Sequence, residues 1–513
     1  MKSLNSEATA TAVIMDEGYN PVPQLNRPDL ILIACISLIG LAVRLPYINQ
    51  GLWIDEIKTL VHFARAPVLE ILSKFDMNNH VLYSLCAHFS ISWLGESAWT
   101  LRLPALLFGV GAISATYYLG RQLASRSEAT LAALFMTLNY HFVWFSQNAR
   151  GYTGLALGAV IATILFIQLV ARKSPPARLI FAYAVVSALS VWIHLTAVVV
   201  IFVHGVVWLV LCVRAIRTDN FSAVAPPAKA LFLGIFISVL MYAPMMGGTL
   251  ENMEVVYQGS LVEKSPLVEY GTWKWAWEEF GKGLTRSMPG GWLFSIVLTA
   301  TLLYGAISYL RQGYVAACLL LLPAMITPVL IFFFAGYFFP RFIFSYFPFL
   351  MLVAVRGGFE LAAQFLRFLS RRQIVAIGIV LAMISATSVP GAWKPKQDFR
   401  AVADFIAQHR QPGDQVVCVR LTHFALSKYL GMNCKLAMNL ETLENYDKRR
   451  EKTWLIYSVP KFIAAQKPEM WAWIRVKAGS AKEYELVKTF EGTLSDGDIV
   501  VLLKQDNTTG KGQ

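Results

Sequence analysis

Long apolar stretches recur along this chain and limit its possible folds more than any other feature. Segments of about 20 mostly apolar residues, the length that crosses the hydrocarbon core of a bilayer, follow one another from Leu30 to Pro390. Hydrophobic residues make up 56% of the 513 residues and charged residues only 15%, and the mean hydropathy is +0.51. Soluble domains carry about 25% charged residues. We therefore predict an all-α polytopic membrane protein.

The apolar stretches predict about eleven spans. These are residues 30–48, 99–119, 130–145, 154–170, 179–193, 195–212, 230–246, 292–310, 315–334, 342–355 and 374–390. The apolar segment 81–94 is shorter and carries His88 with several serines. At this length it fits a re-entrant or interfacial helix better than a span.

Basic residues predict the orientation of these spans. Alternate connections, near Arg121, Arg172, Arg214, Arg311 and Arg371, are short, basic and nearly free of acid, so they should face the cytoplasm. The opposite connections include outer loops 49–98 and 247–291. The protein should therefore be a multi-pass protein of the plasma membrane, with residues 1–29 as a cytoplasmic tail. The net charge of +13 then reflects this bias, and we expect no nucleic-acid partner.

Residues 391–513 have the composition of a soluble domain. Segment 398–414 predicts an amphipathic helix ended by Pro412 and Gly413. Strands are predicted around residues 415–421, 434–438, 453–459, 484–492 and 498–504. This alternation indicates a small extracytoplasmic α/β domain. Cys418 and Cys434 begin successive strands around one helix, so the sequence allows either a disulfide or two free thiols.

Polar residues gather at the outer ends of the predicted spans. Asp55 and Glu56 follow the first span directly, where a carboxylate is costly unless it is needed. The other members are Arg44, Trp53, Asn79, His80, Gln147, Arg150, Tyr152, His194, Arg341 and Tyr346. Each alone has a plain explanation, such as a snorkelling arginine, an interfacial tyrosine or a helix-end histidine. Together they would join a carboxylate that can take a proton with guanidinium groups that can hold a phosphate.

Several stretches resemble glycosyltransferases of the GT-C superfamily. "RLPYINQGLWIDE" matches the Arg–Trp–Asp-Glu pattern of the first outer loop, and "WTLRLPALLFGVGAI" is similar to the second span. "NHVLY", "SQNARGY" and "PRFIFSYFPFL" resemble later motifs of the family. The likeness covers Leu30 to about Pro390. It is most specific over the first 155 residues, and the chain is similar to the bacterial enzymes related to protein O-mannosyltransferases and to the aminoarabinose transferase of lipid A.

This resemblance implies transfer of a sugar from a polyprenyl-phosphate donor to an acceptor hydroxyl, on the extracytoplasmic face and with inversion. Asp55 would be the general base, and Glu56 its positioning companion. Arg341, together with Arg150 and Arg102, would hold the lipid phosphate. We therefore expect Asp55 and Arg341 to share one cleft. The substrate-binding set is completed by Arg44, His80, Tyr152, His194 and Tyr346.

The resemblance also sets the expected partners and cofactors. The acceptor would be a lipid, a glycan or a protein, and membrane lipids would surround the spans. No cofactor is required by the sequence, and a divalent metal stays open. Asn148 stands where the family often has an acid, and "NHVLY" lacks the family's prolines. We therefore expect neither a metal nor an amino sugar to bind through position 148.

Two other classes of function remain open. A transporter or flippase of lipid-linked sugars should carry ionisable residues near the middle of its spans, whereas here the polar residues gather on one side. A non-catalytic scaffold for glycan assembly would tolerate Asp55→Asn. The outer tryptophans Trp273, Trp275 and Trp277 fit either a lid over the site or an interfacial helix.

Overall fold

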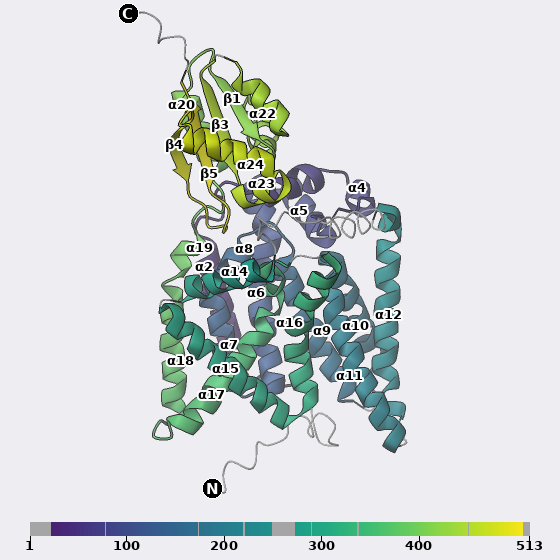
Figure 1. The fold of residues 1–513 in the computed structure, drawn as a ribbon. Coiled ribbons are helices and arrows are strands. Elements are labelled where there is room, and N and C mark those ends of the chain that lie inside the picture. Colours follow the sequence, from purple (N-terminus) through teal and green to yellow (C-terminus); the bar gives the residue numbers. More distant parts are fainter. Residues whose placement is uncertain are drawn as a thin grey trace, which may run out of the picture.

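The computed structural model describes residues 22–505 except 77, 173, 219–220, 249–271, 289, 336–337 and 450. It consists of a helical region and a C-terminal sheet domain that lies on one end of it (Figure 1). We call this end of the helical region the sheet end. Much of the predicted outer loop 247–291 falls outside the described residues.

Helices of varied length make up the helical region. In chain order they are α2 (Arg27–Arg44), α3 (Ile54–Lys58), the π-helical η1 (Thr59–Ala64), α4 (Val68–Ser73), α5 (Val81–Leu94), α6 (Ala98–Leu123), α7 (Arg126–Leu138), α8 (Tyr140–Ser146), α9 (Tyr152–Val170), α10 (Ala177–Ile193), α11 (Ala197–Thr218), η2 (Phe221–Ala223), α12 (Ala225–Tyr242), η3 (Ala243–Met245), α14 (Trp273–Ser287), α15 (Gly291–Gln312), α16 (Tyr314–Ala335), η4 (Pro340–Phe342), η5 (Phe344–Tyr346), α17 (Phe347–Phe365), α18 (Arg371–Ala386) and α19 (Val389–Ala392).

The described residues contain eight helical segments that are long and apolar enough to cross a bilayer. Three of the eleven predicted spans fall short of this measure. The first is α2, whose 18 residues carry charges near both ends, and the second is α10, with 17 residues. The third, 130–145, is divided at Asn139, whose side-chain oxygen accepts hydrogen bonds from the first backbone N–H groups of α8. The number of crossings therefore stays a prediction.

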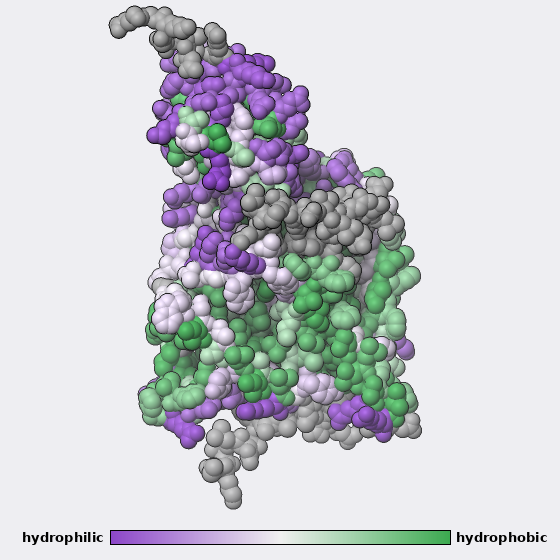
Figure 2. Space-filling model, viewed as in Figure 1, coloured by the Kyte–Doolittle hydropathy of each residue, from purple (hydrophilic) through white to green (hydrophobic). Residues whose placement is uncertain are grey.

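The surface of the helical region is that of a membrane protein. Figure 2 shows apolar side chains in a broad band over the helices, with hydrophilic ones on the far rim and over the sheet domain. The α11–α12, α15–α16 and α17–α18 junctions lie at the end opposite the sheet domain (Figure 1). These are three of the basic connections that the sequence assigns to the cytoplasm. The chain is thus a multi-pass membrane protein with a small C-terminal sheet domain.

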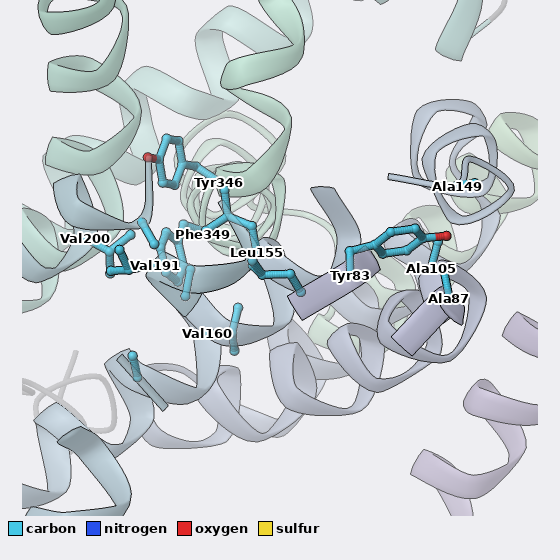
Figure 3. Close-up of a cluster of buried hydrophobic side chains, with 14 of the residues drawn as sticks. Tyr83, Ala87, Ala105, Ala149, Leu155, Val160, Val191, Val200, Tyr346 and Phe349 are labelled. Carbon is cyan, nitrogen blue, oxygen red and sulfur yellow. The ribbon is translucent and has the colours of Figure 1, made fainter. Parts of the chain in front are cut away.

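Helix α5, the segment 81–94, lies at the sheet end beside α4 (Figure 1). It packs on the first turn of α6, where Tyr83 donates to the Leu101 carbonyl at 2.8 Å and Ser90 to the Thr100 carbonyl at 2.6 Å. Figure 3 shows the core below it, where residues of α9, α10 and α11 meet Tyr346 and Phe349. This packed apolar core supports the polar residues at the sheet end.

A five-stranded sheet forms the C-terminal domain, in the order β2-β1-β3-β5-β4. Its elements are α20 (Phe399–His409), β1 (Gln415–Val419), α21 (Leu421–His423), η6 (Phe424–Tyr429), β2 (Lys435–Ala437), α22 (Leu440–Asp447), β3 (Thr453–Ser458), α23 (Pro460–Gln466), α24 (Pro468–Arg475), η7 (Val476–Ser480), β4 (Glu485–Phe490) and β5 (Ile499–Lys504).

Strands β2, β1 and β3 are parallel, and β5 and β4 add to them antiparallel. Each of the five predicted strands is found, and the predicted amphipathic helix is α20, with Asp398 at its N-cap. Cys418 lies on β1 and Cys434 directly precedes the neighbouring β2. Both are buried free thiols. Of the disulfide and the two free thiols that the sequence allows, the structure therefore shows the free thiols.

Candidate active site

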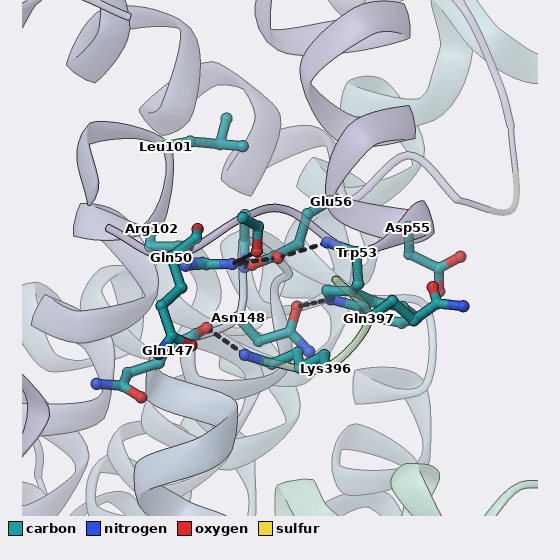
Figure 4. A network of polar contacts seen from close by, with 12 residues as sticks. Gln50, Trp53, Asp55, Glu56, Leu101, Arg102, Gln147, Asn148, Lys396 and Gln397 are labelled. Atoms are coloured by element: carbon teal, nitrogen blue, oxygen red, sulfur yellow. Dashed lines mark hydrogen bonds and ion pairs between the residues drawn. The ribbon is translucent and has the colours of Figure 1, made fainter. Parts of the chain in front are cut away.

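A short helix at the sheet end carries the two adjacent carboxylates. Helix α3 begins after Trp53, whose backbone N–H donates to Glu56 Oε2 at 3.3 Å and so closes the first turn. Consecutive helical residues point about 100° apart, so Asp55 and Glu56 face different sides. Glu56 is fully buried, whereas the Asp55 side chain keeps 16% of its exposure. Figure 4 shows Asp55 pointing away from the network around Glu56.

Glu56 is held by a buried ion pair with Arg102 of α6. Arg102 donates from Nε to Glu56 Oε1 at 2.7 Å and from Nη2 to Oε2 at 2.6 Å. Its remaining N–H groups donate to the carbonyls of Ile48, Gln50 and Gly51. All five guanidinium donors are therefore used, which clamps the backbone before α3. This geometry favours a positioning role for Arg102 over the predicted phosphate contact.

The charge of Glu56 is stabilised from several directions. Burial would raise its pKa, but Arg102, Lys396 and the backbone N–H of Ala149 outweigh burial and hold that pKa below its usual value. The Ala149 N–H donates to Oε1 at 2.7 Å. Glu56 is therefore an ionised anchor between α3, α6 and the α8–α9 connection.

Asp55 meets Arg341 at the end of the α16–α17 connection. Arg341 Nη1 lies 3.7 Å from Asp55 Oδ2, and this is the ion pair that Asp55 forms among the described residues. The guanidinium packs over the rings of Phe339 and Phe342, at 4.6 and 5.8 Å from their centroids. The two residues lie 286 positions apart and share one cleft, as the sequence predicts.

A cavity of about 810 Å³ reaches this cleft. Its walls are mostly apolar side chains of α7, α15, α17 and α18, and Trp53, Asn148, Tyr152 and Arg341 line it as well. Helix α14 lies across the sheet end (Figure 1), with Trp275 buried in the cavity wall and Trp277 exposed. The cavity thus connects the membrane-facing helices with Arg341, the ion-pair partner of Asp55.

A second group of predicted residues lies beside this pair. His80, Tyr152 and His194 contact one another through their rings, with centroids 4.7 to 5.5 Å apart. The Gly151 N–H donates to His80 Nδ1 at 2.8 Å, so the proton of the neutral ring is on Nε2. Burial, followed by the positive charge of Arg150, holds the pKa of His80 well below its usual value.

Arg150 gives this group its charge. Its Nη1 donates to the Asn78 carbonyl at 2.9 Å, while Nε is buried without a hydrogen-bond partner among the described residues. A buried guanidinium N–H with no acceptor is costly. Arg150 and Arg341 therefore make the cleft attractive to an anion.

Two predicted site residues face inward instead. Arg44 is fully buried and donates to Ser146 Oγ and to the carbonyls of Gly40, Met136 and Thr137. Tyr346 is also fully buried, and its hydroxyl accepts from Thr327 Oγ1 at 2.8 Å. These bonds favour a bracing role for both residues over the predicted substrate contact.

Other residues of the site were missed by sequence reasoning. Lys396 donates from Nζ to the Gln147 carbonyl at 2.7 Å and lies over the Trp144 ring. Gln397 Oε1 accepts the Ile54 N–H at 3.1 Å. Both residues follow the last predicted span. Their position between the helical region and the sheet domain was the one feature of the sequence that could have indicated a role in the site.

Position 148 offers no carboxylate that could bind a metal ion. Asn148 stands where the resembling family has an acid, and its Oδ1 accepts a hydrogen bond from Trp53 Nε1 at 3.0 Å. The Asn148 NH₂ group, which can only donate, is buried without a hydrogen-bond partner among the described residues. The described part of the chain holds no group of three His, Cys, Asp or Glu side chains that could bind a metal. We derive no metal-dependent step.

Comparisons with known proteins identify the fold. No family model and no curated protein sequence matches the chain. Among solved structures, ArnT from Cupriavidus metallidurans in the apo state is similar at 13% identity and a TM-score of 0.52, over 92% of this chain and 97% of that one.

Two further structures give lower scores. ArnT bound to undecaprenyl phosphate matches at 12% identity and a TM-score of 0.49, over 93% and 98% of the two chains. The Archaeoglobus fulgidus oligosaccharyltransferase AglB, in complex with an inhibitory peptide and a dolichol-phosphate, matches at 11% identity and 0.47, over 94% and 74%. The match to apo ArnT shows that this chain has a GT-C-like fold.

Proposed function

We propose that this protein is a membrane glycosyltransferase that transfers a sugar from a polyprenyl-phosphate donor to an acceptor hydroxyl at the sheet end. One observation carries the proposal: the apolar cavity between the spans opens beside Arg341, which lies 3.7 Å from Asp55. A polyprenyl tail suits the apolar walls, and a phosphate suits the arginine. ArnT, whose apo structure shares the fold, is also solved with undecaprenyl phosphate bound.

The residues divide the reaction between them. Asp55 takes the proton from the acceptor hydroxyl as its oxygen bonds to the anomeric carbon. The bond from that carbon to the phosphate oxygen breaks, and its electron pair leaves with the polyprenyl phosphate. Arg341 and Arg150 stabilise the charge that develops there. Attack opposite to the leaving group inverts the anomeric carbon.

The resting ion pair links donor binding to the base. A phosphate that approaches Arg341 competes with Asp55 for the same guanidinium. Once the phosphate takes Arg341, Asp55 is released from the pair and can accept the proton. The enzyme therefore acquires its base when the donor is in place.

The supporting residues fix this geometry. Glu56 and Arg102 hold α3, while Arg44 and Tyr346 brace the helices below it. His80, Tyr152 and His194 line the side of the cleft near Arg150 and bind substrate. Asn148 offers an amide N–H₂ without a hydrogen-bond partner among the described residues, which favours a neutral sugar hydroxyl over an ammonium group.

The proposed place of the reaction follows from the predicted orientation. The basic junctions at the opposite end face the cytoplasm, so the sheet end lies outside the plasma membrane. The acceptor is a lipid, a glycan or a protein that reaches this surface. The sequence requires no cofactor for this reaction, and a divalent metal stays open.

A transporter or flippase of lipid-linked sugars is the second candidate. The buried His204 of α11, which faces α9 and α10, is the observation in its favour, because transporters carry ionisable residues within their spans. His204 Nδ1 lies 2.8 Å from the Tyr183 hydroxyl and Nε2 lies 3.2 Å from Thr163 Oγ1. Both ring nitrogens thus have internal partners, so helix packing accounts for this histidine.

Turnover of defined donors tests the proposal. The purified protein in nanodiscs is incubated with undecaprenyl-phosphate mannose, glucose, galactose and arabinose, and released undecaprenyl phosphate is measured by mass spectrometry. We expect release from at least one donor, and loss of release in Asp55→Asn. Movement of intact donor across the bilayer without cleavage would support the transporter instead. If the donor is neither cleaved nor moved, and Asp55→Asn keeps full function in cells, the result would support a scaffold.

A further inference from the structure

The loop between β4 and β5, residues 491–498, leaves the sheet domain and reaches the helical region. In Figure 1 it points from the sheet towards α8 and α14. Four consecutive residues of this loop, Thr493, Leu494, Ser495 and Asp496, line the same cavity as Trp53 and Arg341. The sheet domain therefore forms part of the cavity wall.

Hydrogen bonds to α8, to α14 and to the α19–α20 connection hold the loop in this position. The Thr493 N–H donates to the Pro395 carbonyl at 2.9 Å. Trp144 Nε1 donates to Thr493 Oγ1 at 2.9 Å, and Arg286 Nη1 donates to the Thr493 carbonyl at the same distance. The donors come from α8 and α14, both of which line the cavity. The loop is thus bound to the site and does not merely lie near it.

Two glycines allow the loop to approach this closely. A Cβ at Gly497 would lie 2.7 Å from the Lys396 carbonyl oxygen, and one at Gly492 would overlap the same atom. Real Cβ atoms do not approach backbone oxygens so closely, so either side chain would displace the loop. Lys396 also donates to the carbonyl of Gln147, the residue before Asn148. A rigid path therefore joins the loop to the cleft.

The cavity at this loop has the chemistry of a sugar site. Trp53 and Trp144 pack 6.5 Å apart and place indole rings in the wall, where aromatic faces stack on sugar rings. Asp496 accepts the Lys461 N–H through Oδ2 at 3.0 Å, which fixes its carboxylate. Burial raises the pKa of Asp496 to about 6. Near neutral pH this group exists in both protonation states, so it can accept from or donate to a hydroxyl.

We propose that the β4–β5 loop recognises the sugar of the lipid-linked donor, with Ser495 and Asp496 hydrogen-bonding its hydroxyls. The inference rests on the proposed function. A ligand whose tail fills the apolar part of the cavity and whose phosphate lies at Arg341 places its headgroup between Trp53 and this loop. The loop is then specific for the sugar and indifferent to the tail.

Equilibrium binding separates these contributions without requiring turnover. The dissociation constants of undecaprenyl-phosphate mannose, undecaprenyl-phosphate arabinose and sugar-free undecaprenyl phosphate are measured for nanodisc-embedded protein by tryptophan fluorescence. Asp496→Asn keeps an oxygen for the Lys461 N–H and so preserves the fold. We expect it to weaken the better-bound sugar lipid about tenfold, the usual value of one hydrogen bond to a charged group, and to leave the sugar-free lipid unchanged.

Two more variants complete the test. Gly497→Ala displaces the loop and should also weaken the sugar lipid alone, while Glu491→Gln, exposed on the same loop, should change neither lipid. Equal affinities in wild type and both loop variants would overturn the proposal, as would an equal loss for sugar-bearing and sugar-free lipids. Failure of the wild type to bind any of the three lipids would instead overturn the donor class of the proposed function, and this inference with it.

Discussion

Asp55 and Glu56 are adjacent in the sequence, but their ion pairs with Arg341 and Arg102 lie in different surroundings. Glu56 and Arg102 are buried, lie 2.6 Å apart and are hydrogen-bonded to each other and to five backbone groups. Asp55 and Arg341 lie 3.7 Å apart and keep 16% and 34% of their side-chain exposure. The Glu56–Arg102 pair has no hydrogen-bonding group left for a ligand, whereas the Asp55–Arg341 pair lies at the cavity.

Under the proposed function, this difference divides structure and chemistry between the two residues of one dipeptide. A fully bonded buried pair is costly to break and holds its elements in a single arrangement. A loosely paired carboxylate is held in place but can exchange its partner. Because α3 turns these side chains to different faces, the proposed function assigns the rigid pair to positioning and the loose pair to chemistry. The predictions below test this division of roles.

The largest expected effect is on turnover in Asp55→Asn. The amide cannot take the acceptor proton, so the rate of sugar transfer should fall by about 10²–10⁴-fold, the usual contribution of a general base. The free energy of unfolding should fall by no more than about 1 kcal/mol, as for the loss of a loose, partly exposed ion pair. Release of undecaprenyl phosphate gives the rate. Asp404→Asn, exposed on α20, is the control, and an active, well-folded Asp55→Asn would remove Asp55 from the chemistry.

Glu56→Ala should act on folding. It leaves Arg102 buried without its counter-charge, and breaking a buried pair in this way costs about 3–5 kcal/mol. The matched control is Glu96→Ala, which breaks the exposed pair with Arg65 at 2.6 Å and should cost under about 1 kcal/mol. Thermal unfolding in detergent measures both. Similar losses in the two variants would contradict the structural role of Glu56.

Arg341→Ala should have the next largest effect. Removal of one preorganised charge at the leaving group lowers transfer by about 10²–10³-fold, and the affinity for sugar-free undecaprenyl phosphate should fall too. Arg65→Ala at the exposed pair is the control. Unchanged lipid affinity would place the phosphate elsewhere, with Arg150 as the next candidate.

Sequence patterns predicted much of the fold and the centre of the site. Apolar runs and alternating strand patterns depend on residues close together in the sequence. Both predictions are confirmed, by the helical region and by the five-stranded sheet. Asp55 and Arg341 could be paired in advance because both followed spans on the predicted outer side. Their meeting then depended only on the helices packing together.

Partner identity was harder to predict. Arg102 was predicted to hold the phosphate and Arg44 to bind substrate, because an arginine near a span end has no pattern that reveals its acceptors. In the structure these acceptors are mostly backbone carbonyls, which every residue carries. The contact between the Ile54 N–H and Gln397 spans 343 positions, and the β4–β5 loop reaches the cavity through the docking of a whole domain. Such contacts appear only once the tertiary structure is formed.

The smallest expected effect concerns the pH dependence of stability through Lys396, which lies between the two pairs and the sheet domain. Burial lowers the pKa of Lys396 to about 7, against about 10.4 in an unfolded chain. Between these values the unfolded state binds more protons, so the free energy of unfolding rises with pH. The melting temperature of the wild type should therefore rise relative to Lys396→Met from pH 7 to pH 9. Lys448→Met, at an exposed position, should follow the wild type, and parallel curves for all three would show that Lys396 titrates as an ordinary surface lysine.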